Sequence, residues 1–207
     1  MISPHIFSSV SFVRTAILTA LLTLQSSCSL IPNPDDKLDR FLLDSTPTPA
    51  VLPSKTKKPA LIIDTPTLYA PLDNTRIAIK PSPSTIDYIA DVEWADRLGT
   101  LIHESMIQSA QNSGYFEAVG RMNTGLQSRH MLLIDVRQFH KLCCDKKVEV
   151  EYFVQLLDMQ DRQVLASKSF TMIKDSNEES AKSIALTLNE CHKKLTENVL
   201  SWCAQNM

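Results

Sequence analysis

The residues best suited to chemistry are cysteines and histidines in two short segments. His140, Cys143 and Cys144 lie in one segment, and Cys191 and His192 lie in the other. Thiolate and imidazole ligands at short spacing are typical of tetrahedral zinc, so His140, Cys143, Cys191 and His192 could bind such a metal. This interpretation is weakened because the chain has no C-x-x-C motif. It is weakened further because adjacent residues such as Cys191 and His192 point to different faces of a helix.

Two other interpretations of the cysteines stay open. In an oxidising compartment, the loop at Cys143 and Cys144 could form a disulfide with Cys191 or Cys203, and the sequence does not give the connectivity. Alternatively, Cys191 and Cys203 are buried thiols, because both fall on the apolar stripe of a C-terminal helix. We expect no metal and no cofactor.

The sequence lacks the usual signs of an enzyme. It has no glycine-rich phosphate-binding loop, no G-x-S-x-G motif and only four glycines. Its carboxylates are spread along the chain without a pair that the sequence brings together. His103 is expected on the polar side of a helix and His130 in a loop, both of them solvated. We therefore predict that the protein is not an enzyme.

Length and charge narrow the class further. The chain has 207 residues, and removal of an N-terminal segment leaves one domain of about 150–180 residues. The formal net charge is −2 at pH 7. A basic surface for nucleic acid is therefore not expected.

The N-terminus predicts secretion and lipidation. Residues 1–27 read as a signal peptide, because Arg14 precedes an uncharged apolar run at 15–24 that is too short to span a bilayer. The stretch L-Q-S-S-C resembles a bacterial lipobox, with glutamine where leucine is usual. We predict that Cys28 carries the lipid, such as palmitate, and that 28–37 is a lipidated tether; cleavage that leaves Cys28 free is the alternative.

Alternating and β-branched patterns predict about seven strands beside a short candidate at 38–44. They are expected at 60–64, 76–80, 85–90, 115–119, 131–139, 148–158 and 162–173. The segments 76–80 and 85–90 are joined by P-S-P-S and predict a hairpin. In 148–158, Glu149 and Glu151 are expected to point outward.

Two amphipathic helices are expected beside these strands. The first begins at Asp91 as N-cap and ends at Gly114. Its apolar stripe comprises Trp94, Leu98, Leu101, Ile102 and Met106, and Trp94 docks the helix on a sheet. The second begins with a capping box of Ser176 and Glu179. Its stripe comprises Ala181, Ile184, Ala185, Leu188, Cys191, Leu195, Val199 and Trp202.

These elements predict an α/β or α+β fold. We expect a single domain at 38–207, in which a mixed sheet of about five to seven strands is flanked by two main helices. A proline- and lysine-rich loop at 45–59 interrupts the domain.

Several blocks of the mature chain resemble a known family. They are L-D-N-T-R-I-A-I-K-P-S-P-S-T-I-D-Y-I-A-D-V-E-W-A-D-R-L (72–98), S-G-Y-F-E-A-V-G-R (113–121), L-I-D-V-R-Q-F (133–139), V-E-V-E-Y-F-V-Q-L-L-D (148–158), V-L-A-S-K-S-F (164–170) and V-L-S-W (199–202). In order and spacing, the chain resembles the ABC-type transport auxiliary lipoproteins of Gram-negative bacteria.

The resemblance implies a non-catalytic periplasmic lipoprotein. Its partners would be an ABC permease, an ATPase and a mammalian-cell-entry-type substrate-binding protein, in a system that moves phospholipid or other hydrophobic cargo. A lipid anchor would hold it on the membrane, and Ser29 after Cys28 favours the outer membrane. Homo-oligomerisation stays open, and exposed Ile107, Leu186 and Leu200 are the candidates for partner contact. The alternative is a self-contained envelope lipoprotein with a metal or redox role at Cys143 and Cys144.

Overall fold

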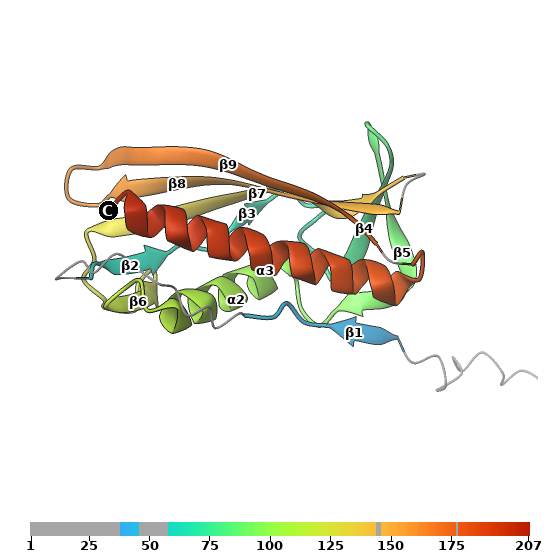
Figure 1. Ribbon diagram of the computed structural model, residues 1–207, viewed down its shortest axis with the longest axis horizontal. Helices are drawn as coiled ribbons and strands as arrows, with labels where there is room; N and C mark the ends of the chain where they lie inside the picture. The colour runs from blue at the N-terminus through green and yellow to red at the C-terminus, as the bar shows by residue number, and fades with distance from the viewer. Residues whose placement is uncertain (1–37, 46–57, 144–145, 177) are drawn as a thin grey trace, which may run out of the picture. The chain divides into compact units, whose positions relative to one another are not determined.

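Nine strands and two helices form in the residues that the computed structural model describes, which are 38–45, 58–143, 146–176 and 178–207 (Figure 1). The strands are β1 (Asp39–Phe41), β2 (Ala60–Ile63), β3 (Thr67–Leu68), β4 (Arg76–Ser82), β5 (Thr85–Trp94), β6 (Ala118–Arg121), β7 (His130–Leu142), β8 (Lys147–Asp158) and β9 (Gln163–Asp175). The helices are α2 (Leu98–Ser113) and α3 (Ala181–Gln205).

All nine strands of the described residues belong to one mixed sheet. β7 is its organising strand, because it pairs parallel with β2, β3 and β4 and antiparallel with β8. β8 continues into β9, which pairs with no other of the described strands. β4 and β5 form the predicted hairpin, and β1 and β6 join parallel to β5 and β2. The predicted mixed sheet with two helices in a single α+β domain is confirmed, although it has nine strands instead of five to seven.

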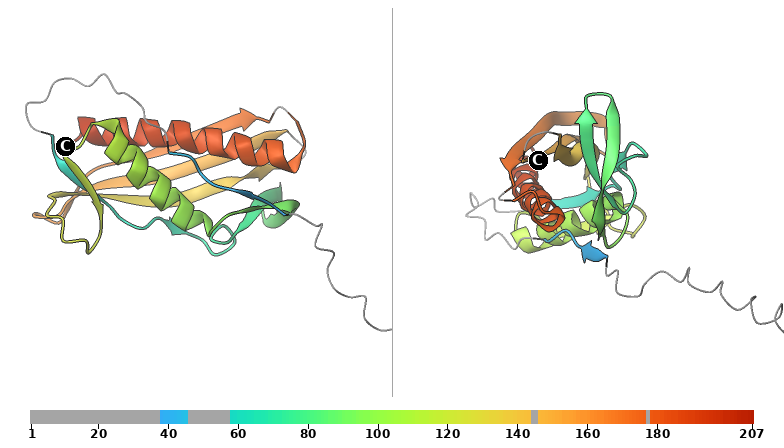
Figure 2. Two further views of the ribbon diagram at one scale, coloured as in Figure 1. Left: turned by 90° about the horizontal axis from the view of Figure 1, so that it is seen from below. Right: turned by 90° about the vertical axis from the view of Figure 1, so that its right-hand side faces the viewer.

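The two helices lie on the same side of the long strands (Figure 2). β8 alternates strictly between buried and half-buried residues, as expected for a strand with one covered face. Its fully buried residues include Val150, Tyr152 and Val154, while Glu149 and Glu151 point outward as predicted. Strands β7–β9 therefore present one face to the helices and leave the other uncovered.

The predicted start of the first helix is wrong. Asp91 and Trp94 belong to β5, and α2 begins only at Leu98. The backbone N–H of Trp94 donates to Thr75 O at 2.7 Å, and Trp94 pairs with Phe41 of β1. Pairing with distant strands therefore overrides the local helical pattern. The predicted end is confirmed, because Gly114 adopts the left-handed conformation with φ of 70°.

Trp94 is buried as predicted, but from a strand. Only 1% of Trp94 is exposed, and its ring packs edge-on against Phe139 of β7 with 5.8 Å between centroids. Glu93, the preceding residue of β5, forms an ion pair with Arg40 of β1 at 2.7 Å.

The last helix has the predicted apolar stripe and a different cap. Ser180 is the N-cap, and its Oγ accepts from the Ser183 N–H at 3.2 Å. The predicted capping box of Ser176 and Glu179 is wrong, because Ser176 lies four residues before the N-cap and its Oγ instead donates to the Glu178 carbonyl.

Some predictions lie outside the described residues. They are the signal peptide, the tether and Cys28 in 1–37, most of the proline- and lysine-rich loop, and Cys144. In the part of the chain that is described, no helix is long and apolar enough to cross a membrane.

Candidate functional site

A serine, a histidine and a tyrosine meet between α2, α3 and β8. Ser105 Oγ lies 2.6 Å from His192 Nε2, and the Tyr152 hydroxyl lies 2.7 Å from His192 Nδ1. Ser105 Oγ also donates to the Ile102 carbonyl at 3.1 Å. One proton arrangement satisfies all three bonds: Tyr152 donates to Nδ1, Nε2–H donates to Ser105, and Ser105 donates to Ile102. The imidazole then gives a proton to the serine, which is opposite to the activation of a nucleophile.

The environment of this cluster also excludes catalysis. His192 and Tyr152 are 0% exposed and Ser105 is 2% exposed. Burial lowers the pKa of His192 to about 3, against a small opposing effect of Asp44. Burial also raises the pKa of Tyr152 well above its ordinary value. Substrate cannot reach groups that are fully buried and neutral, so the cluster joins the two helices to the sheet.

His140 lies away from this cluster, near the end of β7. It is 0% exposed, and its Nε2 is 3.6 Å from Glu149 Oε2. Burial and the charge of Lys80 lower the pKa of His140 to about 4. The imidazole is therefore neutral at pH 7, and the contact with Glu149 is not an ion pair. Neither ring nitrogen has a hydrogen-bond partner among the described residues.

The four residues considered for zinc do not come together. Cys143 is half-buried, and its N–H donates to the Lys80 carbonyl at the end of β4. His192 and Cys191, which were expected on different faces, are both fully buried in the middle of α3. No group of three or more histidine, cysteine or acidic side chains capable of holding a metal occurs among the residues described.

Cys191 and Cys203 fit the interpretation as buried thiols. Both are 0% exposed and neither is in a disulfide. Burial raises the pKa of Cys191 to about 11 and that of Cys203 to about 12, so both are protonated and unreactive. They are twelve residues apart on one helix, about 18 Å along its axis, which is too far for a bond between them. A disulfide from Cys144 stays a prediction.

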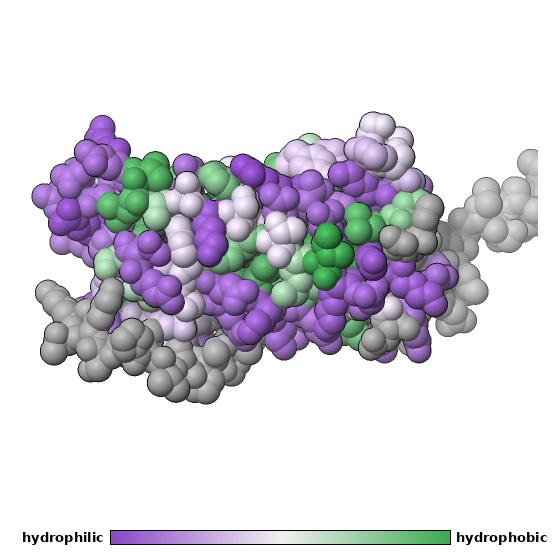
Figure 3. All heavy atoms as spheres, turned by 45° about the horizontal axis from the view of Figure 1, so that its top comes forward, coloured by the Kyte–Doolittle hydropathy of each residue, from purple (hydrophilic) through white to green (hydrophobic). Residues whose placement is uncertain are grey.

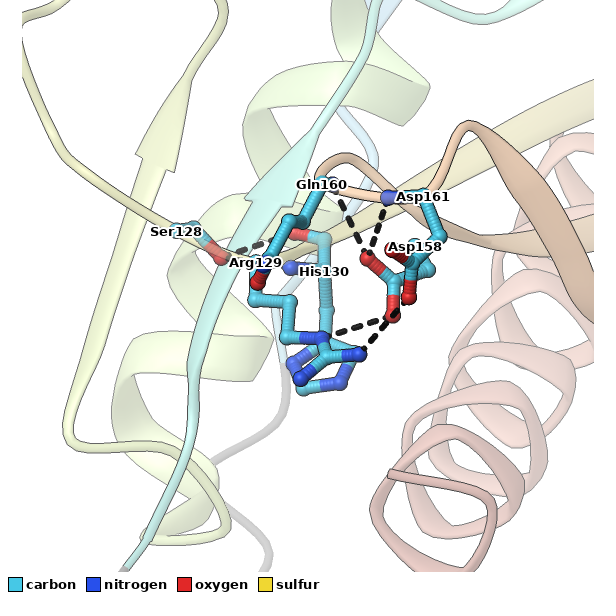
Figure 4. Close-up of polar contacts among 6 residues, drawn as sticks. All are labelled: Ser128, Arg129, His130, Asp158, Gln160 and Asp161. Atoms are coloured by element: carbon cyan, nitrogen blue, oxygen red, sulfur yellow. Dashed lines mark hydrogen bonds and ion pairs between the residues drawn. The ribbon is translucent and has the colours of Figure 1, made fainter.

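A second polar cluster ties the β6–β7 loop to the β8–β9 turn (Figure 4). Arg129 Nε donates to Asp158 Oδ2 at 2.6 Å, and an Arg129 Nη donates to Asp161 at 3.0 Å. Asp158 Oδ1 accepts from the N–H groups of Gln160 and Asp161 at 2.9 and 3.2 Å. Ser128 Oγ donates to the Ala60 carbonyl at 2.7 Å and so fixes the loop to β2.

The charges in this cluster offset one another. Burial raises the pKa of Asp158, but the bonds from Arg129 and from the two backbone N–H groups outweigh it and hold the pKa below its ordinary value. Burial lowers the pKa of His130, the first residue of β7, which is half-buried and not solvated as predicted. An open hollow of about 680 Å³ adjoins Arg129, and its apolar lining includes Ile62, Met122 and Met159. Arg129 is bonded to two carboxylates and is therefore not available to bind a ligand in the hollow. We assign the cluster to stabilisation of the β8–β9 turn.

The uncovered face of β7 and β8 carries an aromatic group among charges. Arg137 stacks on the Phe153 ring, with 4.2 Å from Cζ to the centroid. Arg137 also lies 3.4 Å from Asp135 and 3.6 Å from Glu151. A groove of about 230 Å³ runs beside Phe153, and its lining includes Leu133, Asp64, Asp135, Thr67 and Gln155. Aromatic side chains and arginine are common in binding surfaces, so we treat this face as the candidate functional site.

Of the predicted surface residues, only one is exposed. Leu186 is 45% exposed, which confirms its predicted exposure, while its contact with a partner stays a prediction. Ile107 and Leu200 are each only 2% exposed, so those predictions are wrong. The two helices pack on each other as well as on the sheet, which buries a wider sector than one stripe. His103 is also buried, and its Nε2 lies 3.0 Å from the Ile63 carbonyl of β2, so the prediction of a solvated side chain is wrong.

The sequence reasoning missed the exposure of β9 and the site on the uncovered face. Val164, Leu165 and Ile173 of β9 are 53%, 45% and 55% exposed. A signal was available for Phe153, because it lies in phase with Glu149 and Glu151 in an alternating strand. No local sequence pattern identifies β9 as an edge strand, because its position in the sheet depends on the order of all the strands.

Comparison with known proteins places this fold in a family. The model of the ABC-type transport auxiliary lipoprotein component matches residues 41–199. An uncharacterized protein of Bradyrhizobium diazoefficiens is 26% identical over 151 residues, which are 72% of this chain. The chain spans only 40% of that protein's length.

Two solved structures share the fold. The protein XCC0632 of Xanthomonas campestris has a TM-score of 0.71 at 23% identity, with 79% of this chain and 92% of that chain covered. An uncharacterized protein has a TM-score of 0.61 at 14% identity, with 79% and 96% covered. At these identities the likeness concerns the fold alone. The match over 41–199 spans well over half of the sequence, and the chain therefore belongs to the ABC-type transport auxiliary lipoprotein family.

Proposed function

We propose that the protein is a lipid-anchored, non-catalytic component of an ABC transporter of the mammalian-cell-entry type, which moves phospholipid or other hydrophobic cargo across the cell envelope. The observation that carries the proposal is the family match over residues 41–199. The Ser105–His192–Tyr152 cluster supports a non-catalytic role, because this one catalytic-looking group of the described residues is sealed in the core.

Anchoring is assigned to Cys28. The lipid would attach there after cleavage of residues 1–27, and 28–37 would tether the domain to the membrane. Ser29 favours the outer membrane, with the domain in the periplasm. We expect Cys28→Ala to abolish palmitate labelling and to leave an uncleaved or soluble precursor. Normal labelling of that variant would remove the lipid anchor from the proposal, and membrane fractionation of the unchanged chain tests the choice of membrane.

Recruitment of partners is assigned to the uncovered face of β7 and β8. The candidate partners are the permease, the ATPase and a mammalian-cell-entry-type substrate-binding protein. Phe153 and Leu133 offer apolar surface for desolvation, while Asp64 borders the groove with negative charge and Asp135 is paired with Arg137. An apolar centre with a polar border is the usual arrangement of a binding surface. A partner segment that carries apolar and basic side chains would match this groove.

Copurification from detergent-solubilised membranes tests this assignment. The unchanged chain should retain the transporter components, and the double variant Leu133→Gln with Phe153→Gln should lose most of them. Leu42→Gln is the matched control, because Leu42 is 64% exposed and does not line the groove. The purified protein alone should hydrolyse neither ATP nor phospholipid esters. Hydrolysis that depends on one residue of this chain would overturn the non-catalytic role.

A further inference from the structure

β9 is a long strand with one unpaired edge. It has thirteen residues and pairs along its whole length with β8. On its other side no strand of the described residues pairs with it. The backbone N–H and C=O groups along that side are therefore open to another strand. A strand of this length without proline is a ready template for pairing.

Exposed apolar side chains lie near both ends of this strand. Val164, Leu165 and Ile173 are three of the seven large hydrophobic residues exposed in the described part of the chain. Leu186 of α3 is a fourth, and it lies one helical turn from Glu190, which pairs with Lys174 of β9. Figure 3 shows hydrophobic side chains interrupting the hydrophilic surface on this side of the molecule. β9 also carries Lys168 and Lys174, so pairing at this edge must keep the lysines of the two strands apart.

We propose that β9 pairs antiparallel with β9 of a second copy of this chain, around a two-fold axis that passes beside Ser169. The two sheets would then form one continuous sheet. The contact is isologous, because each residue of one β9 meets its counterpart in the other. This surface is separate from the groove at Phe153. The proposed dimer therefore does not depend on the recruitment of a transporter by that groove.

The geometry of an antiparallel sheet limits where the two-fold axis can pass. Residues directly opposite each other in an antiparallel pair must point to the same face, so the axis must pass beside a residue and not between two residues. Ser169 is the midpoint of Gln163–Asp175, so the register centred on it gives the longest overlap, which is regular over 166–172 and is interrupted at each end by the bulge at Leu165. Leu165 is the extra residue of a bulge against β8. That register brings the bulge of one copy, with the exposed Val164 and Leu165, beside the exposed Ile173 of the other copy.

The charges favour the same register. With Ser169 at the axis, each Lys168 lies opposite Phe170 of the other copy, and both residues belong to the helix-covered face. Within one copy, Lys168 Nζ already lies 5.0 Å from the Phe170 ring. A register centred on Lys168 would place two ammonium groups opposite each other, and one centred on Thr171 would pair Lys168 with Lys174. Like charges directly opposite destabilise a strand pair.

Aromatic side chains lie near the axis. Phe170 packs edge-on against Trp202 of α3, with 6.0 Å between centroids, and Trp202 is half-buried. The two-fold axis would bring this pair from each copy to the helix-covered side of the joined sheets. Tryptophan and phenylalanine are enriched at the centres of interfaces. The pair can therefore anchor the dimer beyond its backbone hydrogen bonds.

Site-directed crosslinking tests the register. Two differently tagged full-length copies are expressed together, and membranes are treated with a short bifunctional thiol reagent. Ser169→Cys should yield a crosslinked dimer that carries both tags, because opposite residues have Cβ atoms about 4.5–5.5 Å apart. Ser167→Cys is the matched control, because four residues along the strands separate its two copies by about 13 Å, beyond the reagent. The unchanged chain gives the background from the native cysteines.

A second variant tests the interface without added cysteines. Leu165→Lys with Ile173→Lys should convert the detergent-solubilised dimer to monomer in sedimentation, while the melting temperature of the domain stays unchanged. A chain that is monomeric before mutation would overturn the proposal. Equal crosslinking at 167 and 169 would overturn the register, and a Ser169→Cys crosslink to a different protein would show that a partner strand and not a second copy pairs with β9.

Discussion

The two faces of β8 use polar and aromatic groups in opposite ways. On the helix-covered face, the Tyr152 hydroxyl is fully buried and hydrogen bonded to His192. On the uncovered face, the adjacent Phe153 is half-buried and stacked under Arg137. Adjacent residues of one strand therefore have different roles. Tyr152 stabilises the interior through its hydrogen bond, and Phe153 provides accessible surface for binding.

This difference separates stability from recruitment. A buried polar group without its partner costs about 1–3 kcal/mol, so the covered face tolerates little change. The side chains of the uncovered face keep contact with water and can exchange it for a partner. Changes to the covered face should therefore alter the free energy of unfolding, and changes to the uncovered face should alter binding.

The largest expected effect is the loss of Trp94. Trp94→Ala removes a side chain that is 1% exposed and packs on Phe139 at the covered face. The free energy of unfolding should fall by about 3–5 kcal/mol, as measured by urea denaturation. Leu42→Ala, at a site that is 64% exposed, should change it by less than about 0.5 kcal/mol. Similar values for the two variants would show that Trp94 does not anchor the core.

Acid should weaken the covered face through His192. Its pKa of about 3 in the folded state lies below the ordinary value of 6.5, so below pH 6.5 the unfolded chain binds the proton more readily. Stability should therefore fall as the pH falls from 6.5 toward 3, by roughly 2–3 kcal/mol between pH 6.5 and 4.5. Urea denaturation across this range measures the slope.

Replacement of His192 by a side chain that does not titrate separates its contribution to the pH dependence of stability from that of other groups. His192→Gln should lower stability at pH 7 and remove roughly half of its dependence on pH between 6.5 and 4.5. His140, with a pKa of about 4, adds a similar slope over this range, and that slope remains in this variant. Asp158 has a lowered pKa, so its contribution is present above about pH 4 and is lost only below that. An unchanged slope in His192→Gln would contradict the role of His192.

His103 should have a smaller effect than His192. His103→Ala removes the bond to the Ile63 carbonyl and leaves that buried oxygen without its partner. We expect a loss of about 1–2 kcal/mol in the free energy of unfolding. Glu104→Ala, next along the helix and paired with Arg121 at the surface, is a control that should cost less than about 1 kcal/mol. Equal values would place His103 in solvent, as the sequence pattern alone suggested.

The long strands could be predicted because their signal is local. β8 alternates between core and outward residues over its full length, and the hairpin of β4 and β5 is encoded by the turn between them. The end of α2 could be predicted for the same reason, because Gly114 supplies the left-handed residue that stops the helix. Each of these elements depends on residues within a few positions of one another.

The errors arise where distant segments decide the outcome. Residues 91–94 were predicted to begin a helix because Trp94 is in phase with the apolar residues that follow. They form a strand instead, because they pair with β1 and β4. Ile107 and Leu200 fall outside the apolar stripes and are buried because α2 and α3 contact each other. His103 is buried because β2 supplies a carbonyl that no local pattern reveals. The candidate site also depends on strand order, because Phe153 and Leu133 become neighbours only when β7 and β8 pair.

The uncovered face should have the smallest effect on stability. Leu133→Gln with Phe153→Gln changes two half-buried side chains that remain in contact with water. The free energy of unfolding should change by less than about 1 kcal/mol, as measured by urea denaturation. A loss as large as that of Trp94→Ala would show that this face is part of the core.

Copurification tests the central claim most directly. Transporter components captured by the tagged full-length chain are compared for the unchanged protein, for Leu133→Gln with Phe153→Gln, and for His103→Ala. We predict that the outward-facing variant loses the partners at nearly unchanged stability, while His103→Ala keeps them despite its lower stability. The opposite pattern, with partners lost only by the destabilised variant, would contradict recruitment through the uncovered face.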